Sequence, residues 1–140
     1  MSTLYFETSA FVKLLVAEPG SQTALHAWRA GFHVSASPLL FVEARASLAA
    51  ARRGGRMTAE GCSRAKHALG ALRLDINQVE VDGAVLISAE ELAEKQGLRG
   101  YDAVHLASAL FAETEVLITA DSALIDAAQR CGLTVVDART

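Results

Sequence analysis

Cysteine and proline are scarce in this chain of 140 residues, which contains two of each. Cys62 and Cys131 stand far apart and neither belongs to a Cys-x-x-Cys pair, so a zinc knuckle is not expected. A reduced protein is the simplest interpretation, with a disulfide between the two left open. No apolar run approaches the roughly 20 residues of a membrane span. Since the N-terminus also lacks the basic start of a secretory signal, we expect a cytoplasmic protein with no membrane partner.

A large excess of one charge is missing as well. Thirteen basic and sixteen acidic residues give a net charge of -3, which excludes a globally basic nucleic-acid coat. The basic residues are nevertheless gathered, because residues 45–73 hold seven of them and one acid. Two interpretations stay open: a solvated helical face, or a stripe of Arg45, Arg52, Arg53 and Arg56 that meets phosphates.

Hydrophobic residues make up 51% of the chain, which excludes a disordered protein, and the length suits a single domain over residues 1–140. Strands are expected near residues 4–6, 33–37, 79–81, 116–119 and 135–136. Helices are expected over residues 10–17, 21–29, 37–53, 58–72, 82–97, 102–112 and 121–130. This alternation predicts an α/β fold, with a central, mainly parallel sheet of about four to five short strands and helices on both faces.

Four acidic side chains stand where the predicted strands end or the next helices begin. Glu7 follows the first strand, Glu43 lies near the first turn of its helix, Asp102 opens a helix, and Asp121 follows the strand that ends at Thr119. Because ligands of open α/β sheets bind outside the carboxyl ends of the strands, we expect the four to converge. Each also has an ordinary interpretation: helix N-caps for the two aspartates, a helix-dipole partner for Glu43 and an exposed side chain for Glu7.

Taken together, these carboxylates favour a metal site. Four neighbouring negative charges either raise their pKa values or hold a cation, and all-oxygen ligands suit Mg²⁺ or Mn²⁺ rather than zinc. Carboxylate-bound Mg²⁺ keeps several waters, one of which can attack a phosphodiester. The pattern therefore predicts metal-assisted phosphodiester hydrolysis. A phosphotransfer enzyme is disfavoured, because the chain has no Asp-x-Asp, Walker A or Gly-x-Gly-x-x-Gly motif.

Four segments carry a resemblance to a known family. Residues 5–14 (YFETSAFVKL), followed by Glu18-Pro19-Gly20-Ser21, resemble the opening of a PIN domain of the VapC toxin type. Residues 37–45 (SPLLFVEAR) are similar to its second acidic segment, and residues 97–107 (GLRGYDAVHLA) to its third, which is the most specific match. Residues 117–121 (LITAD) resemble the fourth. The matches follow one another in the right order over nearly the whole chain.

The resemblance implies a PIN-like α/β/α sandwich and a function. That function is an Mg²⁺- or Mn²⁺-dependent endoribonuclease, the toxin of a type II toxin–antitoxin system, which hydrolyses RNA phosphodiesters with a metal-bound water. It further implies a homodimer that is neutralised by a small antitoxin whose C-terminal segment enters the acidic groove.

Among the implied metal-binding and catalytic residues, Glu7 and Asp102 are the first choices as direct ligands. Asp121 and Glu43 are expected to act directly or through water. The family normally has Asp at the position of Glu7, and the extra methylene matters because Mg²⁺ demands near-octahedral geometry. The alternative function is therefore a PIN-fold binding module whose catalysis is impaired by Glu7.

Other polar residues are expected to support the site. The hydroxyls of Thr8, Ser9 and Thr119 are predicted to bond water, carboxylate or phosphate, with helix capping as the alternative for Thr8 and Ser9. Arg99 is predicted to hold a phosphate bidentately, or else to be a surface charge. His105 shares a helix face with Asp102, and we favour a hydrogen-bonding role for it over that of a general base.

Overall fold

Five short strands form one parallel sheet in the computed structural model, which describes residues 3–31 and 33–140. They are β1 (Thr3–Phe6), β2 (His33–Ala36), β3 (Ile76–Gln78), β4 (Val116–Thr119) and β5 (Thr134–Asp137). Their order is β3-β2-β1-β4-β5, and every neighbouring pair is parallel. The chain builds outward from β1 to one edge and then returns to its other side, so the strand order reverses between β1 and β4. Such a reversal is where open α/β sheets bind ligands.

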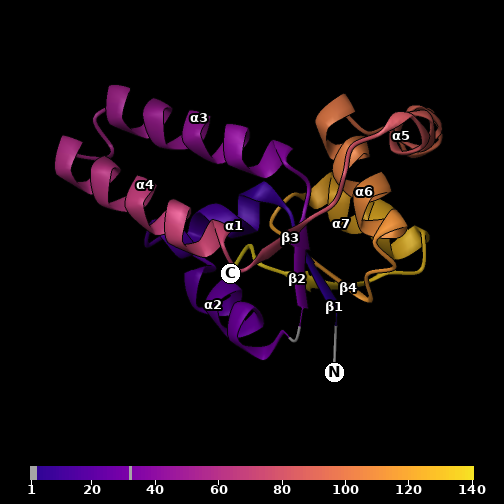
Figure 1. Ribbon diagram of the computed structural model, residues 1–140, viewed down its shortest axis with the longest axis horizontal. Helices are drawn as coiled ribbons and strands as arrows, with labels where there is room; N and C mark the ends of the chain where they lie inside the picture. The colour runs from indigo at the N-terminus through magenta and orange to yellow at the C-terminus, as the bar shows by residue number, and fades with distance from the viewer. Residues whose placement is uncertain (1–2, 32) are drawn as a thin grey trace.

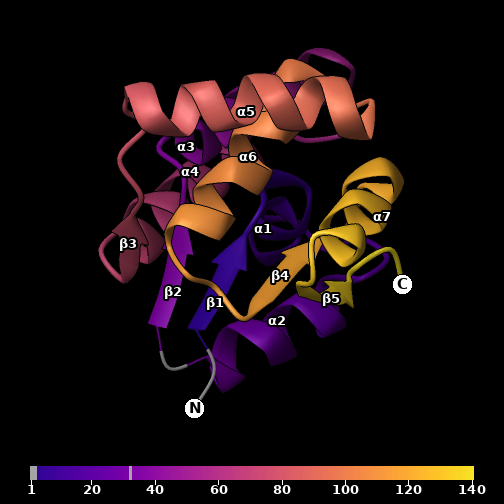
Figure 2. The ribbon, with the colours of Figure 1, turned by 90° about the vertical axis from the view of Figure 1, so that its right-hand side faces the viewer.

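Helices cover both faces of the sheet, which confirms the predicted α/β/α arrangement (Figure 1). On one side lie α1 (Thr8–Leu15), α2 (Ser21–Ala30), α3 (Leu39–Arg53) and α4 (Ala59–Arg73). On the other lie α5 (Gly83–Gln96), α6 (Gly100–Phe111) and α7 (Ser122–Arg130), the side that faces the viewer in Figure 2. Among the described residues, no helix is both long and apolar enough to cross a bilayer.

The central strand β1 shows how the sequence builds two cores. Leu4 and Phe6 belong to one buried cluster, with Phe11 of α1. Tyr5 belongs to the other, with Leu106 of α6 and Leu124 of α7. Successive side chains of a strand point to opposite faces, so three adjacent apolar residues serve both layers. This burial fixes the end of β1, and hence the position of the residue that follows it.

Two expectations about the elements were wrong in detail. The third strand is β3 and not residues 79–81, because Ile76 is the residue that enters the sheet core. Val79 and Val81 instead pack against the α5–α7 cluster, so their alternation marks an extended connection. The helix expected to begin at Asp102 begins at Gly100, with Arg99 at its N-cap position. Cys62 and Cys131 are both free thiols.

Candidate active site

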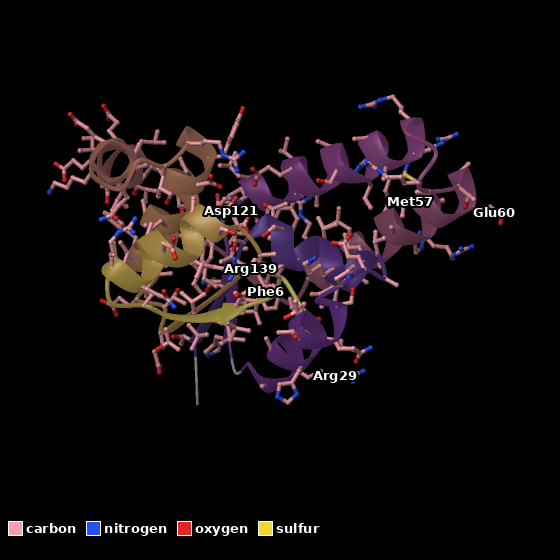
Figure 3. All side chains as sticks on the ribbon, turned by 180° about the vertical axis from the view of Figure 1, so that it is seen from behind. Phe6, Arg29, Met57, Glu60, Asp121 and Arg139 are labelled. Atoms are coloured by element: carbon pink, nitrogen blue, oxygen red, sulfur yellow. The ribbon has the colours of Figure 1, made fainter. Side chains whose placement is uncertain are left out.

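A groove of ≈ 800 Å³ runs from the carboxyl ends of β1 and β4 out along α1 and α3. All four predicted acids, Glu7, Glu43, Asp102 and Asp121, line this single groove. Asp121 lies at one end of the groove, where α7 begins, and the groove reaches Met57 near the tip of the α3–α4 hairpin at the other (Figure 3). The parallel sheet therefore brings together side chains that are more than a hundred positions apart in the sequence.

Glu7 is folded back onto the helix that it precedes. It is buried, occupies the N-cap position of α1 and accepts a hydrogen bond from the Ser9 backbone N–H at 3.0 Å. Its other carboxylate oxygen accepts hydrogen bonds from the hydroxyls of Ser9 and Thr119, the latter at 2.6 Å. The alternative interpretation of Glu7 as an exposed side chain is therefore wrong, since Glu7 is buried. These bonds tie Glu7 to the first turn of α1 and to the end of β4.

Asp102 and Asp121 are joined through Arg99. The Arg99 Nε donates to Asp102 Oδ2 at 3.0 Å, and its Nη2 donates to Asp121 Oδ2 at 3.1 Å. Asp121 also caps α7, because its Oδ1 accepts from the Leu124 N–H at 2.9 Å. Asp121 is thus both the N-cap of α7 and a residue of the groove. Asp102 is not an N-cap, because it lies in the first turn of α6. The Asp102 and Asp121 carboxylates raise the pKa of Arg99, which keeps the guanidinium charged.

Glu43 is held by a different, buried set of polar groups. Its Oε1 bonds His105 Nε2 at 2.6 Å and accepts from the Thr8 hydroxyl at 2.6 Å. The His105 Nδ1 in turn lies 2.8 Å from the Tyr5 hydroxyl oxygen, which also accepts from the Ser37 N–H at 3.1 Å. If the Tyr5 hydroxyl donates to Nδ1, His105 is the neutral tautomer that donates from Nε2 to Glu43. Glu43 is no helix-dipole partner, since the first turn of α3 contains no acid.

Burial and hydrogen bonding set the ionisation of this buried set. Burial raises the pKa of the Tyr5 phenol far above its usual value, so the hydroxyl keeps its proton. Partial burial opposes ionisation of Glu43, but the hydrogen bonds from His105 and Thr8, together with the positive charge of Arg99, outweigh it and lower the pKa of the Glu43 carboxyl. Glu43 therefore enters the groove as a fixed carboxylate.

The supporting residues were only partly predictable. Thr8, Ser9 and Thr119 all bond carboxylates, and capping of α1 falls to Glu7 instead. Sequence reasoning missed Tyr5, which looked like one more apolar strand residue. A tyrosine in the strand with both faces buried was the available signal, because a buried phenol needs a hydrogen-bond partner.

The chemistry of the donor set fits a divalent metal ion, although these side chains do not surround a common point. Among the described residues, no group of three or more Asp, Glu, His or Cys side chains is arranged to hold an ion. Arg99 separates Asp102 from Asp121, and the Glu7 carboxylate is turned toward Ser9 and Thr119. Carboxylate oxygens are the donors that hard divalent cations prefer, and two of these carboxylates bind the Arg99 guanidinium in this structure.

This fold and this groove define the class of protein. The sequence profile of the PIN domain family matches residues 4–130. The chain therefore belongs to the PIN domain family, as the resemblance predicted.

Named relatives extend this result. Ribonuclease VapC45 of Mycobacterium tuberculosis is 41% identical over 110 residues, which cover 79% of this chain and 76% of that protein. The crystal structure of PAE2754 from Pyrobaculum aerophilum is similar with a TM-score of 0.71 and 21% identity, over 96% of this chain and 91% of the other. A toxin–antitoxin complex from Klebsiella pneumoniae is similar with a TM-score of 0.62 and 20% identity, over 87% and 89%. The two structural likenesses support the same fold.

Proposed function

We propose that this chain is a metal-dependent endoribonuclease and the toxin component of a type II toxin–antitoxin system. The observation that carries the proposal is the meeting of Glu7, Glu43, Asp102 and Asp121 in one groove at the strand-order reversal. The similarity to a ribonuclease of the VapC type supports RNA as the substrate. Bound Mg²⁺ or Mn²⁺ would supply a nucleophile by lowering the pKa of water and would offset negative charge at the phosphodiester.

The chain's own residues would prepare this reaction. Asp102 and Asp121 supply oxygens at the mouth of the groove, and Glu7 supplies one from the end of β1. Glu43 is held by His105 and Thr8, so its carboxylate keeps one orientation in which it can accept a hydrogen bond from water. Fixed placement of this kind is what makes a catalytic group effective.

The direct test is cleavage of total RNA with Mg²⁺, with Mn²⁺ or with EDTA. We expect cleavage with either ion and none with the chelator. Asp102→Asn removes a charge while keeping the shape, and should lower the rate more than about 100-fold, beyond the 10–100-fold typical of an outer partner. Asp126→Asn, at an exposed position of α7, is the matched control. Cleavage that survives EDTA would overturn the metal mechanism.

Glu7 separates this function from that of a binding module with impaired catalysis. Aspartate is a good N-cap, so Glu7→Asp should keep α1 capped while placing its carboxylate differently in the groove. We expect metal-dependent cleavage to increase, measured as kcat/KM on one RNA. Wild-type cleavage that is already fast and does not increase would show that the extra methylene is harmless. No cleavage by either protein would favour the binding module.

An arginine stripe along α3 and the connection that follows it is the proposed path of the RNA backbone. Arg45, Arg52, Arg53 and Arg56 are exposed, and none of them forms an ion pair within residues 3–31 and 33–140. Arg56 lines the groove. Replacing all four by Ala should reduce the salt dependence of RNA binding, with the slope of log K against log salt falling by about three. An unchanged slope would contradict this path.

The walls of the groove suit a protein partner. Beyond the acids, Val12, Val16 and Leu48 make its wall apolar, so a peptide with apolar side chains and one cation near the acids would fit. We propose that this peptide belongs to a small antitoxin, and the similar fold in a toxin–antitoxin complex from Klebsiella pneumoniae supports such a partner. Ala50→Arg, inside the groove, should stop co-purification with the product of a short reading frame directly upstream. Ala46→Arg, on α3 outside the groove, should not.

A second copy of the chain is the proposed partner of an apolar hollow of ≈ 630 Å³ beside the groove. Tyr101 borders both cavities, and Val42 and Leu86 are exposed in the hollow. Exposed apolar surface of this kind marks an interaction site. We expect a dimer by light scattering, and Val42→Asp should give a monomer. Leu74→Asp changes an exposed leucine elsewhere and should leave the dimer intact.

A further inference from the structure

Arg99 fills the space between two carboxylates with a positive charge from the chain itself. One guanidinium spans Asp102, in the first turn of α6, and Asp121, at the start of α7. Without a cation, the Asp102 and Asp121 carboxylates would repel each other, and the exposed Arg99 guanidinium offsets part of that repulsion. Arg99 therefore acts as the counter-ion of both Asp102 and Asp121.

We propose that Arg99 is a built-in competitor of the divalent ion. It neutralises Asp102 and Asp121 while the groove holds no metal, and it leaves them when the ion binds. The two cations cannot share the same two Oδ2 atoms without strong repulsion, so binding of one displaces the other. This inference rests on the proposed function and assigns to one residue a role in metal affinity.

The exposure of the three side chains shows which of them can move. The Arg99 side chain is 75% exposed, whereas those of Asp102 and Asp121 are 7% and 23% exposed. An exposed ion pair is weak, because water screens it and a long side chain loses freedom in making it. The aspartates are fixed by burial and by the cap of α7. Exchange of cations thus requires the movement of one exposed side chain and leaves the ligands in place.

The displaced guanidinium stays close to the reaction. Arg99 precedes α6 directly, so its side chain remains at the mouth of the groove after it releases the aspartates. A planar guanidinium matches the oxygens of a phosphate group. The same residue should therefore weaken metal binding and strengthen RNA binding, which are effects of opposite sign.

The experiment measures Mn²⁺ affinity without RNA, by calorimetry and by the electron paramagnetic resonance signal of free Mn²⁺. Arg99→Gln should bind Mn²⁺ about 3–10-fold more tightly than wild type, because the competing charge is gone. Arg99→Lys keeps the charge and should stay closer to wild type. Arg29→Gln removes an exposed arginine of α2 far from the groove and should leave the affinity unchanged. In cleavage at saturating metal, Arg99→Gln should raise KM for RNA.

The outcomes distinguish this inference from the proposed function. If wild type cleaves RNA with metal but Arg99→Gln binds Mn²⁺ equally well or more weakly, the competitor role is wrong and the nuclease stands. If wild type neither binds Mn²⁺ nor cleaves RNA, both fail. If Arg99→Gln binds Mn²⁺ more tightly than wild type and Arg29→Gln does not, the inference is supported. If both variants bind Mn²⁺ more tightly to the same extent, the change reflects net charge and the competitor role is wrong.

Discussion

Glu43 and Asp102 each bring a carboxylate into the same groove, and each bonds a basic side chain, but the surroundings of the two bonds differ. His105, the partner of Glu43, has no exposed side-chain surface, whereas Arg99, the partner of Asp102, is 75% exposed. A buried polar pair costs much free energy to break, and an exposed pair costs little. The Glu43 side of the groove is therefore built as part of the core, and the Asp102 side is built to exchange its partner.

Removing the buried base should have the largest effect on stability. His105→Ala removes one hydrogen-bond partner each from Glu43 and the Tyr5 hydroxyl, and it opens a cavity in a fully buried place. We expect a loss of about 3 kcal/mol or more in the free energy of unfolding, measured with urea. His67→Ala changes an exposed histidine of α4 and is the control. A loss below about 1 kcal/mol would show that the buried Glu43–His105 pair contributes no more to stability than the exposed Asp102–Arg99 pair.

Tyr5→Phe tests the far end of the same buried set with a smaller change. It removes one oxygen and leaves His105 Nδ1 and the Ser37 N–H unsatisfied. The expected loss is about 1–2 kcal/mol in the free energy of unfolding. Tyr101→Phe makes the same chemical change at an exposed position and should be neutral. Equal results for the two variants would mean that the buried hydroxyl contributes nothing.

The ionisation of Glu43 should make the stability of the protein depend on pH. Its pKa in the folded protein lies below the usual value of 4.5, so the folded state binds protons less readily than the unfolded state. The stabilisation is complete above pH 4.5 and is lost as the pH falls through the lower folded value. Glu43→Gln should thus be less stable than wild type at neutral pH, and the gap should narrow in acid. For Glu90→Gln, on the surface of α5, the difference in free energy of unfolding from wild type should not change with pH. A difference that stays constant with pH for Glu43→Gln would contradict the lowered pKa of Glu43.

Arg99→Ala should have the smallest effect on stability, although it breaks two ion pairs. Both pairs include a highly exposed side chain, so we expect the midpoint of thermal unfolding to match wild type within error. Arg130→Ala, at an exposed arginine of α7, provides the comparison. A drop as large as that of Tyr5→Phe would show that Arg99 stabilises the fold, which would weaken the contrast between the two sides.

Much of the fold was predictable because the local patterns agree with the final structure. Short strand-like segments alternate with helices along the chain, and that alternation predicts the parallel sheet that is observed. Prediction failed where one residue decides. Ile76 and not Val79 packs into the core beside β1, and α6 begins two residues before Asp102, since packing against the rest of the molecule selects among equally plausible local choices.

The candidate site was predictable as a set of acids but not as an arrangement. The positions of Glu7, Glu43, Asp102 and Asp121 after strands or near helix starts are written in the sequence, because strand ends and caps have local signatures. The sequence does not show which basic side chain each acid contacts. His105 faces Glu43 across 62 positions of sequence, and Arg99 reaches Asp121 across 22. These residues come into contact only when the sheet aligns the ends of its strands. The burial that fixes the His105–Glu43 pair, and the exposure that leaves the Arg99–Asp121 pair exchangeable, exist only in the folded chain.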